Sequence, residues 1–403
     1  MRRTFPASLA LALLCLAACK KNHDNATPTI LAISPQQAAG GAQITIEGTG
    51  LPNSNQLSVT INDSPATIIS GTSTALSVIV PKKAGSGHVL VKINGQIITG
   101  PLFQYDTVWF VSTFAGSTQG YANANGTAAL FNYPQGICVD AQGNLYVTDP
   151  GNYRIRKITS DGTVSTLAGS TLGYQDGPGS SAQFGYPSDI CRDAAGNLYV
   201  SDWGNNAIRK ISPNGTVGTL LGTSAGLNRP SGLSVDSQGN LYIADGQNNR
   251  ILKVTPDTVV SVLAGGTQGS ADGTGTAASF NNVIGLTIDS IGNLFAVDGA
   301  NDAIREITPA GVVTTVLKTF NPTEVYTDRR DALFFTSFYD IIGEATLTGY
   351  ASTLAGMYAN QGYTEGFGNE ALFNHPYGIC VDAAENIFVC DAGNNRIRKL
   401  VWQ

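Results

Sequence analysis

The side chains best suited to chemistry in this chain are carboxylates and aromatic rings, because imidazoles are scarce. The 403 residues include 3 histidines, and after residue 106 only His375 remains. Zinc sites favour several imidazole or thiolate ligands, and serine-type catalysis needs a histidine beside the nucleophile. With one imidazole, no CxxC pair and no GxSxG elbow, this region is predicted to lack both kinds of site.

Carboxylates recur at one position of a repeated pattern. Each ends a short apolar run of the type Asn-Leu-Tyr-Val-x-Asp, namely Asp149, Asp202, Asp245, Asp298 and Asp391. A row of carboxylates around a channel could hold a cation such as calcium. A residue found in nearly every copy of a repeat is better explained as part of the scaffold, bonded to turn amides or a neighbouring arginine. We predict no bound cofactor and no metal, with calcium left as the alternative.

The repeat itself predicts the fold of residues 107–403. Its clearest copy, PQGICVDAQGNLYVTDPGNYRIRKI, starts at Pro134, and further copies start at Pro187, Pro230, Val283, Pro376 and, in decayed form, Pro322. Copies about 40–55 residues apart, each with several short strands, are typical of β-propeller blades. The PxGIxVD, GNLYVxD and NxRIRKI elements resemble the NHL-repeat family.

A second element, of the type VSTLAG, recurs between these copies and implies how the ring closes. There are six of each. The first VSTLAG element, Val111 to Gly116, precedes the first long copy, and none follows the last. We therefore predict that the strand near Val111 completes the blade that begins at Pro376, which leaves no open sheet edge.

The connections between the four strands of a blade differ on the two faces of the propeller. Turns such as DAQGN are short and uniform on one face (the short-turn face), whereas the other carries long, variable loops (the long-loop face). Variable loops on a rigid scaffold often carry binding sites. Aromatics that recur at one loop position are expected to pin the loops: Phe131, Phe184, Phe280 and Phe373. Trp203 and Tyr153 do not recur in this way and lead the candidate ligand-binding set, which also includes Tyr133, Tyr186, Tyr377, Tyr339, Arg229 and His375.

Residues 28–106 precede the repeat and have the pattern of a small sandwich of about seven strands. The segments ISP, ITIEGTGL, VTIND, VIVP and VKING resemble the IPT/TIG domain, which implies an immunoglobulin-like fold that acts as a spacer or interaction module. The predicted fold is thus all-β: a small Ig-like β-sandwich followed by a six-bladed β-propeller closed by an N-terminal strand.

The N-terminus reads as an export signal. Residues 1–18 combine two arginines with a short apolar core, and the ending Leu16-Ala17-Ala18-Cys19 resembles the lipobox of bacterial lipoproteins. That resemblance implies lipidation of Cys19, a tether over residues 19–27, and a place in the cell envelope, with the outer membrane facing the exterior favoured. The lipid would be the only membrane contact. Later cysteines are predicted to be free thiols, and Cys138, Cys191 and Cys380 to be small buried hydrophobes.

Charge and architecture together favour binding over catalysis. A net charge of −6 argues against a nucleic-acid partner. Propellers similar to NHL repeats include amidating lyases, which use several metal-bound histidines, and lactonases, which use a carboxylate-bound cation. A lipid-tethered Ig-like spacer carrying a propeller resembles the surface binding lipoproteins of glycan-degrading Bacteroidetes. We predict a non-catalytic lipoprotein that binds a glycan on the long-loop face. A protein-binding scaffold or adhesin, and a carboxylate- or metal-dependent lyase or lactonase, remain alternatives.

Overall fold

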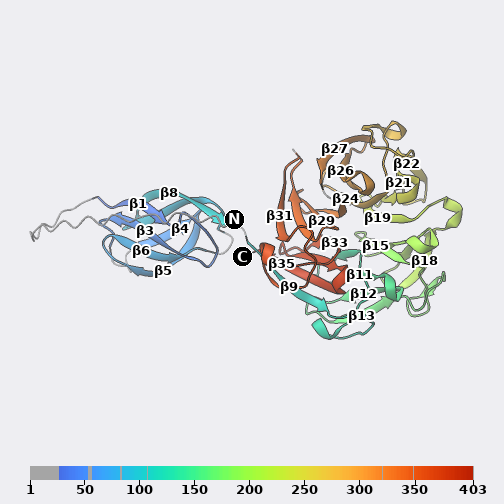
Figure 1. Cartoon of the computed structure of the whole chain (residues 1–403), viewed down its shortest axis with the longest axis horizontal. Helices are drawn as coiled ribbons and strands as arrows, with labels where there is room; N and C mark the ends of the chain where they lie inside the picture. The colour runs from blue at the N-terminus through green and yellow to red at the C-terminus, as the bar shows by residue number, and fades with distance from the viewer. Residues whose placement is uncertain are drawn as a thin grey trace, which may run out of the picture. The chain divides into compact units, whose positions relative to one another are not determined.

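A computed structural model describes residues 27–52, 57–81, 84–106, 108–319, 321–347 and 349–402. The chain divides into two compact units, Met1–Asp106 and Thr107–Gln403 (Figure 1). In the described residues every regular element is a strand or a short 3-10 helix, which confirms the all-β prediction. The predicted signal segment, Cys19 and nearly all of the tether lie outside the described residues. None of the described helices has the length and apolarity needed to cross a bilayer.

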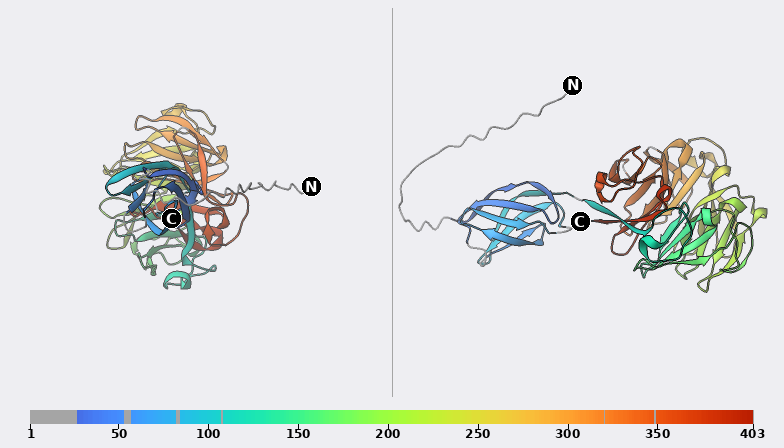
Figure 2. Two further views of the ribbon diagram at one scale, coloured as in Figure 1. Left: turned by 90° about the vertical axis from the view of Figure 1, so that its left-hand side faces the viewer. Right: turned by 60° about the horizontal axis from the view of Figure 1, so that its bottom comes forward.

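The first unit has eight strands arranged in two layers (Figure 2). They are β1 (Thr29–Ser34), β2 (Gln37–Ala39), β3 (Gln43–Thr49), β4 (Leu57–Ile61), β5 (Ser64–Gly71), β6 (Ala75–Ile79), β7 (Gly87–Ile93) and β8 (Gln96–Asp106). Alternate residues such as Ile44, Ile46, Val89 and Val91 are fully buried between the layers. The strand beyond the expected seven is β2, whose three residues pair in parallel with the end of β8. It is too short to show an alternating pattern.

The second unit has six blades of four antiparallel strands each. In chain order, blade 1 comprises β10 (Ile137–Val139), β11 (Leu145–Asp149), β12 (Arg154–Ile158) and β13 (Val164–Ala168); blade 2, β15 (Pro187–Arg192), β16 (Leu198–Asp202), β17 (Ala207–Ile211) and β18 (Thr216–Leu221); blade 3, β19 (Pro230–Val235), β20 (Leu241–Asp245), β21 (Arg250–Val254) and β22 (Val260–Gly265); blade 4, β24 (Val283–Ile288), β25 (Leu294–Asp298), β26 (Ala303–Ile307) and β27 (Val312–Lys318); blade 5, β28 (Pro322–Thr327), β29 (Leu333–Ser337), β30 (Ile341–Ala345) and β31 (Ala351–Gly356); blade 6, β33 (Pro376–Val381), β34 (Ile387–Asp391), β35 (Arg396–Trp402) and β9 (Trp109–Gly116). Two-residue strands, β14 (Gly177–Pro178), β23 (Gly273–Thr274) and β32 (Gly366–Phe367), extend the outer edges of blades 2, 4 and 6.

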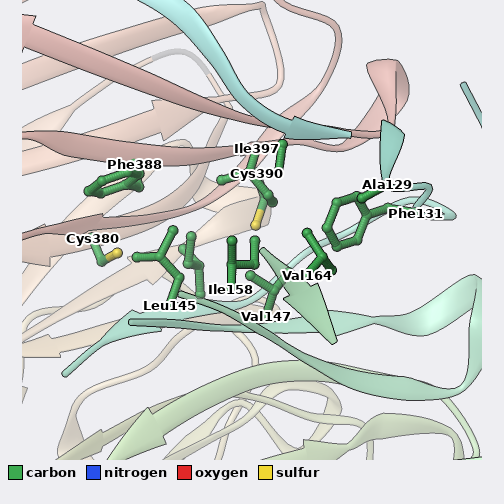
Figure 3. Packing of buried hydrophobic residues seen from close by; sticks show 12 residues of the cluster. Ala129, Phe131, Leu145, Val147, Ile158, Val164, Cys380, Phe388, Cys390 and Ile397 are labelled. Carbon is green, nitrogen blue, oxygen red and sulfur yellow. The ribbon is translucent and has the colours of Figure 1, made fainter. Parts of the chain in front are cut away.

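The ring closes as predicted, because the outermost strand of blade 6 comes from the start of the propeller sequence. Strand β9 pairs with β35 from Trp109 opposite Trp402 to Gly116 opposite Arg396; in Figure 1 the teal β9 lies beside the red β35. Blade 6 then packs against blade 1 through an apolar interface (Figure 3). There Phe388 and Cys390 face Leu145 and Val147, and all four are at most 3% exposed.

The repeated aspartates are scaffold residues, as predicted. In blade 1 the Arg156 guanidinium donates to the Asp149 carboxylate at 2.8 Å and to the loop carbonyls of Leu130 and Ala122, each at 2.9 Å. The same pairing recurs in blades 2, 4 and 6, as Arg209–Asp202, Arg305–Asp298 and Arg398–Asp391. Each of these arginines is at most 1% exposed. A buried charge pair thus fastens each long loop to its blade.

The recurring phenylalanines also pin the loops. Phe131, Phe184, Phe280 and Phe373 are all 0% exposed, and each ring lies about 5 Å from the guanidinium carbon of its blade's buried arginine. Blade 5, the decayed copy, has Ser337 and Gly343 in place of the aspartate and arginine. A Cβ on Gly343 would lie 2.3 Å from the Phe335 ring, so this blade is held together by apolar packing instead.

Candidate functional site

Six residues that immediately precede the inner strands form a ring around the channel mouth on the long-loop face. They are Tyr133, Tyr186, Arg229, Asn282, Asn321 and His375. All except Tyr186 adopt positive φ, between 46° and 60°. The backbone N–H of each of these five donates to a side-chain oxygen of the preceding blade, supplied by Asn395, Asn206, Asn249, Asp302 and Asp340. Contacts between neighbouring blades therefore position this ring.

The boundary between blades 1 and 2 departs from this arrangement. Tyr153 occupies the left-handed position (φ 57°) that Asn206, Asn249 and Asn395 fill elsewhere, although bulky residues seldom adopt this conformation. It supplies no short side-chain acceptor, and the Tyr186 N–H donates instead to Asp202 at 3.2 Å. The Tyr186 ring packs on Trp203 with centroids 5.7 Å apart, and its hydroxyl accepts a hydrogen bond from Gln135 at 3.2 Å. The break in the pattern thus coincides with an aromatic pair at the mouth.

A cavity of about 450 Å³ opens at this mouth, and we call it the mouth pocket. This volume is in the range of small-molecule sites. Three aromatic side chains line it, Tyr186, Trp203 and Tyr377. The other lining side chains are mostly polar and come chiefly from the inner strands: Gln135, Ser188, Asp189, Ser231, Asn282, Ile284, Thr323 and Glu324.

The structure brings together some of the predicted ligand-binding residues and separates others. Tyr186, Trp203 and Tyr377 line the mouth pocket. Tyr133 packs edge-on against Tyr377 at 5.9 Å, and the Arg229 guanidinium lies 4.6 Å from the Trp203 ring. These five belong to one cluster. Because the three pocket aromatics are half-buried, the expectation that they sit on exposed loop positions was wrong.

The remaining candidates lie elsewhere. Tyr339 packs against Tyr358, with ring centroids 5.0 Å apart. His375 stacks on Phe338 at 4.0 Å and shares a 2.7 Å hydrogen bond with Gln361. Neither Tyr339 nor His375 lines the mouth pocket, and Tyr153 does not line it either.

The tyrosines around the pocket are neutral hydrogen-bonding groups. Burial raises the pKa of Tyr133, Tyr186 and Tyr377 above the usual tyrosine value. Tyr133 and Tyr377 also share a side-chain hydrogen bond. Their hydroxyls therefore stay protonated at neutral pH and are suited to hydrogen bonding and ring stacking rather than to acting as bases.

Two carboxylates in the pocket, Asp189 and Glu324, were missed by the sequence analysis. They occupy the third position of the inner strand, where the other four blades have glycine: Gly136, Gly232, Gly285 and Gly378. Glycine suits this position because neighbouring inner strands approach closely, so that a Cβ on Gly378 would lie 2.2 Å from the Gln135 carbonyl oxygen. The signal was visible in the repeat, since PSDI and PTEV depart from PxGI.

Both carboxylates turn toward the same side of the channel. Asp189 accepts a hydrogen bond from the Leu233 N–H of blade 3 at 2.8 Å. Glu324 accepts one from the Leu286 N–H of the adjacent blade 4 at 3.1 Å, and one from the Val325 N–H at 3.0 Å, both on Oε1. In the described part of the chain, neither carboxylate forms an ion pair.

Their environment makes ionisation unfavourable. Burial raises the pKa of Asp189 to about 6. Burial, followed by the nearby Asp189 charge, raises the pKa of Glu324 well above its usual value. The two groups therefore resist carrying a full negative charge each at neutral pH.

Below these carboxylates the channel continues toward the short-turn face. A second cavity of about 240 Å³ is lined by the inner strands of all six blades, and Asp189 and Glu324 line both cavities. Cys138 and Cys191 are half-buried and line this lower part of the channel, so describing them as buried core residues was wrong; Cys380 is buried as expected. All four described cysteines are free. Within the described ranges no group of three or more His, Cys, Asp or Glu side chains is arranged to hold a metal.

Comparison with known families identifies both units. Residues 28–105 match the IPT/TIG domain. Residues 131–158 and 373–400 match the NHL repeat, and residues 174–328 match the teneurin NHL domain. The chain thus belongs to the proteins that join an IPT/TIG domain to an NHL-repeat β-propeller.

Solved structures share this architecture at low sequence identity. A protein of unknown function from Bacteroides thetaiotaomicron is 18% identical, with a TM-score of 0.63 over 94% of this chain and 99% of that one. An auxiliary nutrient binding protein from Bacteroides ovatus is 17% identical, with a TM-score of 0.59 over 93% and 98%. A gluconolactonase from Xanthomonas campestris is 16% identical, with a TM-score of 0.52 over 73% and 90%. These likenesses establish the fold, and the proteins that share it include both binders and enzymes.

Curated relatives match only part of the chain. The protein Suppressor of Quenching 1 from Arabidopsis thaliana is 34% identical over 91 residues, which is 22% of this chain and 9% of that protein. The chain therefore spans about a tenth of the length of such relatives.

Proposed function

We propose that this protein is a non-catalytic, lipid-anchored binding protein of the bacterial cell envelope that holds a glycan in its mouth pocket. The observation that carries this proposal is the convergence of Tyr186, Trp203 and Tyr377 around a concave, polar-floored cavity. Aromatic faces provide rigid, largely apolar contact area, against which the C–H face of a sugar ring can stack. The floor provides hydrogen-bond partners for sugar hydroxyls. The nutrient-binding neighbour from Bacteroides ovatus is consistent with a binding role.

The shape of the site favours a small ligand over a protein surface. The conserved geometry of a stable protein interface would bury at least about 1,200 Å² of total surface and would centre on exposed anchor residues. Here the aromatic groups are half-buried and face inward. A protein-binding scaffold or adhesin therefore ranks below glycan binding.

Catalysis is the second candidate function, because Asp189 and Glu324 lie in the channel without a basic partner. A lactonase or lyase of this kind would use them to hold a cation or move a proton. Turnover of a lactone or glycan that depends on added calcium or zinc, and that is lost in Asp189→Asn, would favour the enzyme over the binder.

Loss of the pocket aromatics should weaken glycan binding. Trp203→Ala and Tyr186→Ala are each expected to cost about 1 kcal/mol or more of binding free energy, a loss of about fivefold or more in affinity. A glycan array would first identify a ligand, and isothermal titration calorimetry would then compare the variants. Tyr350→Ala is the matched control, since Tyr350 is 69% exposed in a turn on the short-turn face. Unchanged binding in both pocket variants, or equal loss in the control, would contradict the proposed site.

The lipid anchor can be tested separately. Cys19→Ser removes the predicted acceptor of the lipid, so the protein should move from the membrane fraction to the soluble fraction. Immunoblotting of fractionated cells, with Cys138→Ser as the control, measures the shift. A Cys19→Ser variant that stays in the membrane fraction to the same extent would refute lipid anchoring at this residue.

A further inference from the structure

From the mouth pocket and the two carboxylates on its floor, we infer that the bound ligand is an amino sugar whose protonated amine sits between Asp189 and Glu324. This inference rests on the proposed glycan-binding function and specifies the chemical class of the ligand. Three features of the site support it: the hydrogen-bonding character of the floor, its uncompensated negative charge, and the aromatic wall.

The floor is rich in hydrogen-bond acceptors. The hydroxyl protons of Thr323 and Ser231 are donated to backbone carbonyls of neighbouring blades, at 2.8 Å and 3.3 Å. Each hydroxyl oxygen therefore keeps lone pairs for a ligand but has no proton to offer. Asp189 and Glu324 add carboxylate oxygens, and Glu324 Oε2 has no protein hydrogen-bond donor among the described residues. A ligand that matches this floor must supply donors, as hydroxyl and ammonium groups do.

The charge of the floor is not balanced by the protein. Arg192 follows Asp189 on the same inner strand and lines the lower channel, yet it forms no ion pair with either carboxylate in the described residues. Arg229 stacks on Trp203 and does not line the pocket. Burial and mutual repulsion raise the pKa of both carboxyl groups, so an arriving cation would relieve the repulsion between them.

The wall complements a cation that is attached to a sugar ring. The faces of Trp203, Tyr186 and Tyr377 attract an ammonium group through their π-electron density, and they can also stack on the apolar face of a pyranose. Four blades keep glycine at the position of the two carboxylates. The fold therefore does not require acidic side chains there, and their presence in blades 2 and 5 needs a different explanation, which ligand binding provides.

The test compares an aminated oligosaccharide with its neutral counterpart on the full chain. Titration calorimetry would use β-1,4-linked glucosamine oligomers and the same oligomers N-acetylated, with trilysine as a peptide source of amines. We expect the wild type to bind the aminated oligomer at least tenfold more tightly than the acetylated one and than trilysine. We also expect its affinity to fall as sodium chloride is added.

Two pairs of variants test the carboxylates. Asp189→Asn and Glu324→Gln keep an oxygen that can accept the backbone N–H bonds, whereas Asp189→Gly and Glu324→Gly restore the residue that the repeat has elsewhere. Each is expected to weaken binding of the aminated oligomer at least tenfold, to leave binding of the acetylated oligomer within twofold, and to melt at or above the wild-type temperature.

The outcomes separate this inference from the proposed function. Equal affinity for the two oligosaccharides, or carboxylate variants that bind the aminated oligomer as the wild type does, would overturn the amino-sugar inference while glycan binding stood. Tighter binding of trilysine would assign the site to a basic peptide and overturn the inference. No saturable binding of either oligosaccharide would overturn the inference. If the glycan array also showed no ligand, the proposed function would fail with it.

Discussion

Replacing Arg209 with leucine should lower the free energy of unfolding of the propeller by about 3–5 kcal/mol. The change removes the partner of Asp202, whose carboxylate is 0% exposed, and leaves that charge buried. It also removes the donors to the Gln183 and Gln175 carbonyls, at 2.8 Å and 2.9 Å. The loop that leads to Tyr186 would lose its attachment to blade 2. Chemical denaturation followed by tryptophan fluorescence measures the loss.

The chain offers its own control for this prediction. Blade 3 has Leu252 at the position of Arg209, and there Arg250 reaches the aspartate instead, at 2.7 Å from Asp245. Blade 1 has an arginine, Arg154, at the position of Arg250, whereas blade 2 has Ala207. Arg156→Leu should therefore cost less than Arg209→Leu, because Arg154 can replace the lost partner. Equal losses in the two variants, or a loss below about 1 kcal/mol in Arg209→Leu, would show that the buried pair is not what holds the loop.

Removing the strand that closes the ring should prevent the propeller from folding cooperatively. A chain that begins at residue 117 lacks β9, and with it Val111 and Ala115, both 0% exposed. Strand β35 would then be an unpaired edge, which promotes aggregation. A chain that begins at residue 107 keeps β9 and loses only the first compact unit. The chain starting at 107 is expected to melt at the temperature of the propeller in the full chain, and the one starting at 117 to aggregate or to lose its cooperative transition.

Calorimetry and size-exclusion chromatography distinguish these outcomes. A monomeric chain starting at 117 with an unchanged melting temperature would show that β9 is dispensable for closure. If both truncated chains fail equally, the first unit rather than β9 would be supporting the propeller.

The sequence by itself determined the fold, the number of blades, the closure of the ring and the structural roles of the repeated aspartates and phenylalanines. It did so because each copy of the repeat places the same residue types in the same local environment. A residue such as Asp149 or Phe131 can therefore be interpreted from its counterparts in other blades.

Only the tertiary structure decided which unique residues meet. Tyr186, Trp203 and Tyr377 come from blades 2 and 6 and share one pocket, whereas Tyr339 and His375 lie outside it. Asp189 and Glu324 departed visibly from the repeat in sequence, but their common cavity depends on the closed ring, which brings the inner strands of blades 2 and 5 to one channel. Repetition specifies each blade locally, and the packing of six blades around one axis sets the distances between residues far apart in the chain.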